Sequence, residues 1–298
     1  MRSSEERRTA AVRAFYKEAP FPNYGARDTL ETLRRRAERS PLARLLDQAI
    51  PRDARVLELG CGTGQMTLFL ASGSDRRLVV GADLTRASLA LAADAARRFG
   101  VERARFVECD LRRPALAEGA FDVVLSLGVL HHTPDPRAAF RALVPLARPD
   151  GGIVVVGLYN AFARLPHRLR RLVARATGLR FVPFDPVLRD RRAEPARRAA
   201  WLRDKYLHPE EHRQTLGEVQ TWFRENDVTY LRSYPSALLG GPDGRDGRRN
   251  DDALRGDELF APAADDWWPE GVLAQLGWMR TLGAEGGLFV VVGQRQAA

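Results

Sequence analysis

The chain has 298 residues, of which 45% are hydrophobic and 29% are charged, and its formal net charge is +9. These values are ordinary for a soluble globular protein with one large domain. No apolar run approaches the ~18 residues of a membrane span, and the first residues are too charged for a signal peptide, so we expect a cytoplasmic protein.

The positive charge is concentrated in one part of the chain. Residues 161–205 hold 13 basic and 4 acidic side chains, and their balance of +9 equals the net charge of the whole sequence. Two of the 47 basic residues are lysines and the others are arginines, a bias that indicates a GC-rich genome more than selection for nucleic acid. The sequence therefore predicts one basic segment on a nearly neutral body.

Two helices are expected before the first strand. They cover Ser4–Glu18 and Asp28–Ala49, and an aromatic turn with two prolines, Ala19–Gly25, separates them. Proline has no backbone N–H and restricts its own φ, so the first helix cannot continue through this turn.

A glycine-rich turn follows the first expected strand. The strand, Val56–Leu59, leads directly into Gly60, Gly62 and Gly64. Short apolar runs bounded by glycine are typical of buried parallel strands, and glycine lets the backbone approach a ligand closely. A dinucleotide site of the Gly-x-Gly-x-x-Gly type needs a third glycine where this chain has Gln65. The turn therefore predicts a nucleotide site that lacks the pyrophosphate signature.

The next two strand ends carry carboxylates. The second strand, Leu78–Ala82, ends at Asp83, which can accept the hydroxyls of a ribose, as in NAD enzymes. The third strand, Ala104–Glu108, leads to Asp110 and Leu111. A carboxylate there can accept from an exocyclic amine while the following N–H donates to a ring nitrogen, which is an arrangement that reads adenine.

A fourth strand, Phe121–Ser126, leads into a segment with two adjacent histidines, His131 and His132. A helix over Arg137–Ala147 follows, and the fifth strand covers Ile153–Leu158. Strands that alternate with helices in this way indicate an α/β fold with a parallel sheet.

Taken together, these motifs resemble the class I S-adenosylmethionine-dependent methyltransferases, and within them the type-11 and ubiquinone/menaquinone-biosynthesis enzymes. The resemblance implies an α/β fold with a seven-stranded Rossmann-like sheet, mostly parallel with an antiparallel last strand, plus a helical N-terminal lid and helical insertions. It covers roughly residues 50–160. The segments that carry it are Val56–Gly64, Gly81–Asp83, Glu108–Asp110, Phe121–Val124, His131–Asp135 and Leu146–Gly152.

The resemblance also implies that the cofactor is S-adenosyl-L-methionine, bound at the carboxyl ends of the strands. Glu58 would orient its methionine end through the ammonium group or a water, or would only orient the glycine turn. Asp83 would take the ribose hydroxyls, and Asp110 with Leu111 would take the adenine. The residues expected to bind the cofactor are Glu58, Gly60, Cys61, Gly62, Gly64, Asp83, Leu84, Asp110, Leu111, Ser126, Leu127 and Gly128.

The rest of the chain is expected to complete the sheet around two insertions. Strands six and seven are assigned to Val228–Arg232 and Leu288–Gly293, and helices to Phe162–Ala176, Glu194–Tyr206 and the stretch from Thr215. The resulting division is an N-terminal helical lid at 1–50, a cofactor-binding core at 51–158, a basic helical cap at 159–214, and the rest of the core at 215–298 with a Trp-rich insertion at 236–286 that includes a loop at 240–255.

His131 and His132 are the expected catalytic residues. A neutral imidazole at this sheet edge could take a proton from the substrate. Alternatively, as the resemblance implies, these histidines cap a helix or pack against the cofactor. No metal is expected, because the spacing of His208 and His212 is explained by a helix that starts at Pro209.

The acceptor is expected to be a small or lipid-like molecule, and arginines of residues 161–205 could hold a carboxylate or phosphate on it. Two alternatives stay open: RNA methylation with the same segment as a phosphate track, and a non-catalytic S-adenosylmethionine-binding protein. The sequence does not distinguish oxygen, nitrogen and carbon acceptors, and it does not indicate an oligomeric state. The aromatic residues expected to contact the acceptor are Tyr16, Tyr24, Tyr159, Tyr206 and Trp201, with the tryptophans of the last insertion as further apolar walls.

Overall fold

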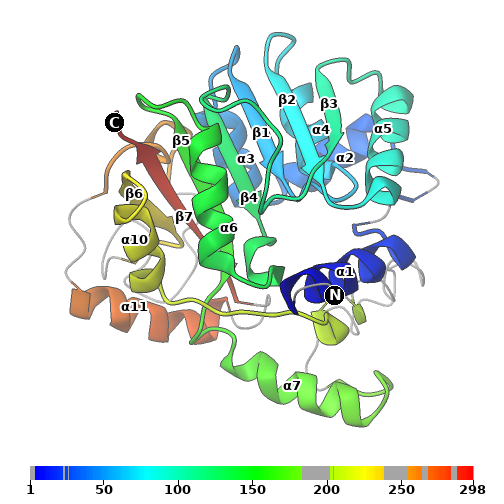
Figure 1. The fold of residues 1–298 in the computed structure, drawn as a ribbon, viewed down its shortest axis with the longest axis vertical. Helices are drawn as coiled ribbons and strands as arrows, with labels where there is room; N and C mark the ends of the chain where they lie inside the picture. The colour runs from blue at the N-terminus through cyan, green and yellow to red at the C-terminus, as the bar shows by residue number, and fades with distance from the viewer. Residues whose placement is uncertain are drawn as a thin grey trace.

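A seven-stranded sheet runs through the described part of the chain and carries helices on both faces (Figure 1). The computed structural model describes residues 4–22, 24–25, 27–182, 202–203, 205–237, 254–263, 268–282 and 287–297. The strands are Arg55–Leu59 (β1), Leu78–Asp83 (β2), Ala104–Glu108 (β3), Val123–Leu127 (β4), Ile153–Tyr159 (β5), Val228–Tyr234 (β6) and Leu288–Arg295 (β7).

The strands follow the spatial order β3-β2-β1-β4-β5-β7-β6. The first five are parallel, whereas β7 is antiparallel to both of its neighbours, β5 and β6. The predicted fold class, a mostly parallel seven-stranded α/β sheet, is therefore confirmed. Because β1 pairs with β2 on one side and β4 on the other, the chain changes its direction of travel across the sheet there. In open α/β sheets a ligand binds beside this point, at the carboxyl ends of the strands.

Two apolar cores cover the two faces of the sheet. Side chains alternate between the faces along each strand, so Val56 and Val123 belong to one core and Leu57 and Val124 to the other. The helices are Ser4–Glu18 (α1), Leu30–Glu38 (α2), Pro41–Ala49 (α3), Gln65–Ser72 (α4), Arg86–Phe99 (α5), Pro136–Leu143 (α6), Leu165–Ala176 (α7), Leu216–Arg224 (α10) and Trp268–Thr281 (α11). Residues of α2, α3 and α4 pack in the first core, and residues of α6, α10 and α11 pack in the second.

The N-terminal region contains one more break than the sequence predicted. The first helix, α1, has the predicted bounds, but a single helix over Asp28–Ala49 is wrong, because the chain forms α2 and α3 there. Ser40 caps α3 by accepting the backbone N–H of Ala43, and Pro41 occupies its first turn. Proline in the first turn begins a new helix and cannot extend the preceding one.

The elements around the fourth strand also differ from their predicted bounds. β4 begins at Val123, and Phe121 forms only an isolated bridge, with Ala147. The Asp122 carboxylate between them accepts from the backbone N–H of Arg55 at 2.8 Å. The predicted helix over Arg137–Ala147 ends early, since α6 stops at Leu143 and a 3-10 turn follows. Pro145 has no N–H to continue the α-helical hydrogen bonds.

Two predicted elements fall mainly on residues outside the described part. They are the helix around 194–206, of which residues 202–203 and 205–206 are described, and the loop at 240–255. Within the described residues, no helix has the length and apolar character needed to cross a membrane.

Candidate active site

A cavity of about 550 Å³ lies at the carboxyl ends of β1, β2 and β4. Its volume falls within the ~300–1,000 Å³ of small-molecule sites. Three parts of the chain line it: the strand ends with their turns, residues of α1 to α3 with the turn at Phe21 and Pro22, and the segment 127–134 that follows β4. The cavity thus occupies the expected ligand position in this fold.

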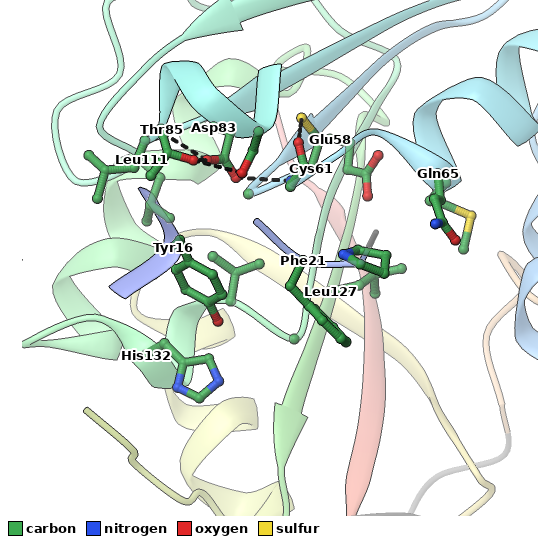
Figure 2. Close-up of a pocket in the computed structure, with 18 of the residues that line it drawn as sticks. Tyr16, Phe21, Glu58, Cys61, Gln65, Asp83, Thr85, Leu111, Leu127 and His132 are labelled. Atoms are coloured by element: carbon green, nitrogen blue, oxygen red, sulfur yellow. Dashed lines mark hydrogen bonds between the residues drawn. The ribbon is translucent and has the colours of Figure 1, made fainter. Parts of the chain in front are cut away.

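The cavity has two ends of different chemistry (Figure 2). Glu58 and Asp83 lie at one end, which we call the acidic end, and Tyr16 and His132 lie at the other, the aromatic end. Leu127 lies between them. Two reactants bound at these ends would meet near the carboxyl end of β4.

The glycine turn brings backbone to the acidic end. Gly62 has a φ of +54°, and a Cβ there would collide with the carbonyl oxygen of Phe21. Glycine alone adopts this conformation without strain and leaves room for the turn above it. Gly64 serves a different purpose, because it begins α4 and packs against the ring of Phe106 without lining the cavity.

Asp83 is fixed by the turn that it faces. One carboxylate oxygen accepts from the Gly62 N–H at 2.9 Å, and the other accepts from the backbone N–H and the hydroxyl of Thr85, both at 2.8 Å. Burial raises the pKa of Asp83, and these hydrogen bonds oppose the rise. The carboxylate is therefore held in one orientation at the cavity wall.

Asp110 is held by a partner that the sequence analysis did not identify. The Arg112 guanidinium donates to it at 2.8 and 3.2 Å, and the Arg112 backbone N–H donates at 3.0 Å. Burial alone would raise the pKa of Asp110, but the bonds from Arg112 outweigh it and the pKa is lowered. Asp110 is thus an ionised acceptor beside Leu111, which also lines the cavity.

Glu58 is a buried carboxylate at the acidic end, with an exposed fraction of 6%. Burial raises its pKa to about 7, although it accepts a hydrogen bond from the hydroxyl of Thr67. A carboxylate with such a pKa in a cavity gains most from a bound cation, which would favour its charged form.

Most of the residues predicted to bind the cofactor line this cavity. Ser126 does not: it is fully buried, and its hydroxyl donates to the carbonyl of Leu59 at 3.1 Å, joining β4 to β1. Those that line the cavity are Glu58, Gly60, Cys61, Gly62, Asp83, Leu84, Asp110, Leu111, Leu127 and Gly128.

His132 lies on a 3-10 helix, Leu130–His132, at the aromatic end. Its Nδ1 lies 2.7 Å from the carbonyl oxygen of Glu210, and its ring stacks on His208 with centroids 3.6 Å apart. Burial and then the neighbouring His131 lower the pKa of His132 well below its usual value. The imidazole is therefore neutral at pH 7, donates from Nδ1 and keeps Nε2 as an acceptor.

His131 does not line the cavity. It is fully buried and stacks on Tyr159 at 3.8 Å, and neither ring nitrogen has a hydrogen-bond partner in the described residues. Burial lowers its pKa well below the usual value, so it is neutral as well. The structure therefore places His131 behind the cavity, where it supports Tyr159.

Only some of the aromatic residues predicted to contact the acceptor line the cavity. Tyr16 and Tyr159 line the cavity. Tyr24 lies outside its wall and donates from its hydroxyl to the carbonyl of Thr63 at 2.8 Å, whereas Tyr206 is buried in a small separate cluster with Leu202. Trp201 and Trp267 lie outside the described residues, the side chain of Trp268 is not described, and Trp278 packs in the core against Phe289.

Comparisons with known proteins agree with this geometry. Residues 56–151 match the family described as a methyltransferase domain. Ubiquinone biosynthesis O-methyltransferase of Bordetella bronchiseptica is 30% identical over 190 residues, which are 60% of this chain and 74% of that protein. The chain belongs to the class I S-adenosylmethionine-dependent methyltransferases.

Two further proteins are similar to this chain, one in sequence and one in structure. An uncharacterized protein of Synechococcus sp. is 29% identical over 217 residues, which are 63% of this chain and about half, 52%, of that protein. The structure of 1,6-didemethyltoxoflavin-N1-methyltransferase from Burkholderia thailandensis, with 1,6-didemethyltoxoflavin and S-adenosylhomocysteine bound, has the same fold. Its TM-score is 0.52 at 18% identity, and the match covers 99% of this chain and 92% of that one.

The cofactor of the methyltransferase is S-adenosyl-L-methionine. The cavity fits this molecule, because the acidic end offers the carboxylates of Glu58 and Asp83, which can accept from an ammonium group and from ribose hydroxyls. A Cβ at Gly62 would fill space beside the same end.

Sequence reasoning missed a basic residue of the methyltransferase site. Arg36, on α2, lines the cavity and donates to Asp28 at 2.6 Å, and its other terminal nitrogen is buried without a partner in the described residues. Arginine is so common in this chain that composition gave no signal for it. Its position in α2, well before the glycine turn, also hid its place in the cavity wall.

The predicted basic cap contributes little to the cavity wall. Of the described residues between 159 and 214, only Tyr159 lines it. Two arginines of this segment, Arg164 and Arg171, pair with the buried carboxylate of Glu211, each at 3.0 Å. Part of the positive charge is therefore neutralised inside the protein. No group of three or more His, Cys, Asp or Glu side chains in the described residues is arranged for a metal.

Proposed function

We propose that the methyltransferase transfers the methyl group to a hydroxyl oxygen of a small, largely apolar acceptor that binds at the aromatic end. One observation carries the proposal: His132 presents a neutral imidazole to the cavity with Nδ1 bound to the Glu210 carbonyl, so Nε2 can accept a hydroxyl proton. The name of the Bordetella relative, an O-methyltransferase of ubiquinone biosynthesis, supports the same acceptor atom.

The acidic end would hold the cofactor through four side chains. We assign the methionine ammonium to Glu58 and the methionine carboxylate to the free guanidinium nitrogen of Arg36. Asp83 would take a ribose hydroxyl, and Asp110 with the Leu111 N–H would take the adenine edge. Each assignment rests on the burial and hydrogen bonds of these residues at the cavity wall.

The aromatic end would enclose the acceptor. Val12 and Tyr16 of α1 line the cavity, as do Tyr159 and Leu288 of the paired strands β5 and β7. Such a surface favours an aromatic ring over a highly charged molecule. The predicted N-terminal lid is consistent with this arrangement, because α1 supplies part of the wall.

Catalysis would depend mainly on alignment. When bound, S-adenosylmethionine supplies a methyl group already activated by its sulfonium charge. The cavity walls hold the acceptor oxygen in line with that group and exclude water, which lowers the entropic cost of the encounter. His132 would accept the hydroxyl hydrogen bond and take the proton as the oxygen–carbon bond forms and the methyl–sulfur bond breaks, which leaves the electron pair on a neutral thioether. It would then release the proton to solvent, since burial disfavours imidazolium.

RNA is the weaker candidate for the acceptor. Arg164 and Arg171 are engaged with Glu211, so they are not available to phosphates without breaking a buried ion pair. The cavity wall at the aromatic end is also apolar.

The test is an assay with S-adenosylmethionine and three acceptor sets: small phenols and catechols, aromatic amines, and a short RNA. We expect methyl transfer to a phenolic oxygen. The His132→Gln variant should lower kcat at least about tenfold, while calorimetry finds its affinity for S-adenosylhomocysteine unchanged.

An exposed pair provides the control for this assay. Arg137→Ala breaks the ion pair of Arg137 with Glu225, which lies away from the cavity, and should keep full activity. Transfer only to amines, or only to RNA with a steep loss of rate as salt rises, would refute the proposal.

A further inference from the structure

Two segments from opposite parts of the chain meet at the aromatic end. One is α1, and the other is residues 208–212, which lie beside it (Figure 1). Arg8 of α1 donates from Nε and Nη2 to the Glu210 carboxylate, at 2.7 and 2.5 Å. The guanidinium of Arg8 lowers the pKa of Glu210, and the His212 ring nitrogen lies 2.9 Å from the same carboxylate.

The same short segment also holds the 3-10 helix that carries the two histidines. The carbonyl of Glu210 accepts from Nδ1 of His132 at 2.7 Å. The backbone N–H of His212 donates to the carbonyl of His131 at 2.8 Å. Glu210 therefore contacts α1 through its side chain and His132 through its backbone.

Helix α1 buries little apolar surface. Val12 is the only buried residue among its fifteen. Its contacts with this region also include the ion pair of Glu18 with Arg203, which lies over the Phe15 ring at 4.8 Å. The rings of Phe15 and Tyr16 contact His208, with centroids 5.1 and 5.5 Å apart. An element with few buried apolar contacts opens at low cost, so single ion pairs weigh heavily in its position.

We propose that Glu210 is a positioning residue that couples the docking of α1 to the orientation of His132. With α1 docked, Arg8 holds the Glu210 carboxylate, the Glu210 carbonyl stays on Nδ1 of His132, and Tyr16 faces His132 across the aromatic end (Figure 2). When α1 leaves, Glu210 loses Arg8 and the imidazole loses its fixed tautomer. The acceptor site is then open and its histidine is unaligned.

This inference deepens the proposed function and rests on it for the role of His132, but its test needs no acceptor. The chain has 5 histidines, so the ring nitrogens of all of them can be followed by ¹⁵N NMR, with His132→Gln for assignment. In the wild type the two His132 nitrogens should give the well-separated signals of one tautomer. In Arg8→Ala and, less strongly, Glu210→Gln these signals should move toward each other.

Coupling must also work in the opposite direction, because linkage between two sites is reciprocal. Hydrogen exchange of the α1 amides should therefore accelerate up to about fivefold in His132→Phe, the limit expected when one partly exposed ion pair is weakened. Arg8→Lys, which keeps the charge, should retain most of the wild-type protection.

The matched control is again the ion pair of Arg137 with Glu225, in which a guanidinium binds a carboxylate through the same two nitrogens. Arg137→Ala should change neither readout. An unchanged His132 tautomer in Arg8→Ala, or unchanged α1 exchange in His132→Phe, would overturn the coupling, and so would equal effects in Arg137→Ala. A failure to methylate phenols would leave these readouts intact and would count only against the proposed function.

Discussion

Among single residues, Glu58 is the carboxylate whose charged form would gain most from a bound cation. Its carboxylate is buried, it receives a hydrogen bond from Thr67, and burial still raises its pKa to about 7. The free protein therefore carries a site whose charged form is disfavoured until a cation arrives. The ammonium group of the cofactor is the cation that we assign to it.

We expect the affinity for S-adenosylmethionine to depend on pH through Glu58. Below the Glu58 pKa of about 7 this carboxyl is protonated in the free protein, so binding must release a proton, and affinity should fall as the pH drops. The limit is about tenfold per pH unit. Affinity should also decline above pH ~8, where an α-amino group loses its charge.

Calorimetry between pH 5.5 and 8 in buffers of different ionisation enthalpy measures both the affinity and the released proton. Glu58→Gln should bind more weakly at pH 8 and show a flat profile below pH 7. A wild-type profile that is already flat below pH 7 would rule out Glu58 as the partner of the cation.

Residue roles differ in how far sequence could reveal them. The places of Asp83 and Asp110 at the cavity wall were predictable, because a strand and the residue after it are local in sequence. Arg36 and the partner of His132 were not. The Glu210 carbonyl lies 78 positions away from His132, and no local pattern encodes that contact. Tyr206 lies in a buried cluster and not at the cavity wall, and an aromatic side chain suits both places equally well.

At the scale of elements, the glycine turn and the turn at residues 21–22 form one unit. The Gly62 backbone approaches the carbonyl of Phe21, and the Thr63 hydroxyl donates to the carbonyl of Pro22. The N-terminal segment thus closes over the turn that faces the cofactor. A substitution in one turn should therefore displace the other turn.

Gly62→Ala tests this unit. The new Cβ would meet the Phe21 carbonyl and would also place alanine at a φ of +54°. We expect a loss of about 2 kcal/mol or more in the free energy of unfolding and at least about a tenfold loss of affinity for S-adenosylhomocysteine. Chemical denaturation and calorimetry measure the two effects.

Gly100→Ala is the matched control. Gly100 has a φ of +66° at the end of α5, and nothing lies within 4 Å of a Cβ there. The Gly100→Ala variant should lose roughly 1 kcal/mol in the free energy of unfolding from backbone strain alone, and its affinity for S-adenosylhomocysteine should not change. Equal losses of stability and affinity in the two variants would mean that the contact of Gly62 with residues 21–22 contributes to neither.

The helices illustrate what a periodic pattern misses. One helix was predicted over 28–49, and apolar side chains are buried in both helices found there, through Leu33 of α2 and Leu46 of α3. The break is encoded by Ser40 and Pro41, a cap followed by a first-turn proline. Capping signals are short, so a reading based on periodicity passes over them.

For the whole molecule, the sequence was sufficient for the fold and for the residues that line one end of the cavity. Strands with their following turns occur in a regular order, so the sheet and its acidic end could be predicted from local segments. The aromatic end could not, because it is assembled from α1, β5, the histidine segment and β7. These parts are distant in sequence, and only tertiary packing brings them together.

Because three distant parts of the chain line the cavity, ligand binding should stabilise the protein globally. At ~100 times its dissociation constant, S-adenosylhomocysteine should add about 2.7 kcal/mol to the free energy of unfolding. The Tm should then rise by roughly 5–10 °C, as measured by calorimetric scanning, and by much less in Gly62→Ala. Adenosine at the same concentration is the control ligand and should give a smaller shift, since it lacks the methionine end.

The position of β7 has a consequence for biosynthesis. Residues 288–295 lie between β5 and β6, although both of those strands leave the ribosome first. Until β7 emerges, the hydrogen-bonding edge of β5 has no neighbour, and such an edge recruits other strands. The edge of β5 therefore stays unpaired and prone to aggregation while well over a hundred further codons are translated. A chaperone that covers β5 during this period would raise the yield of folded protein.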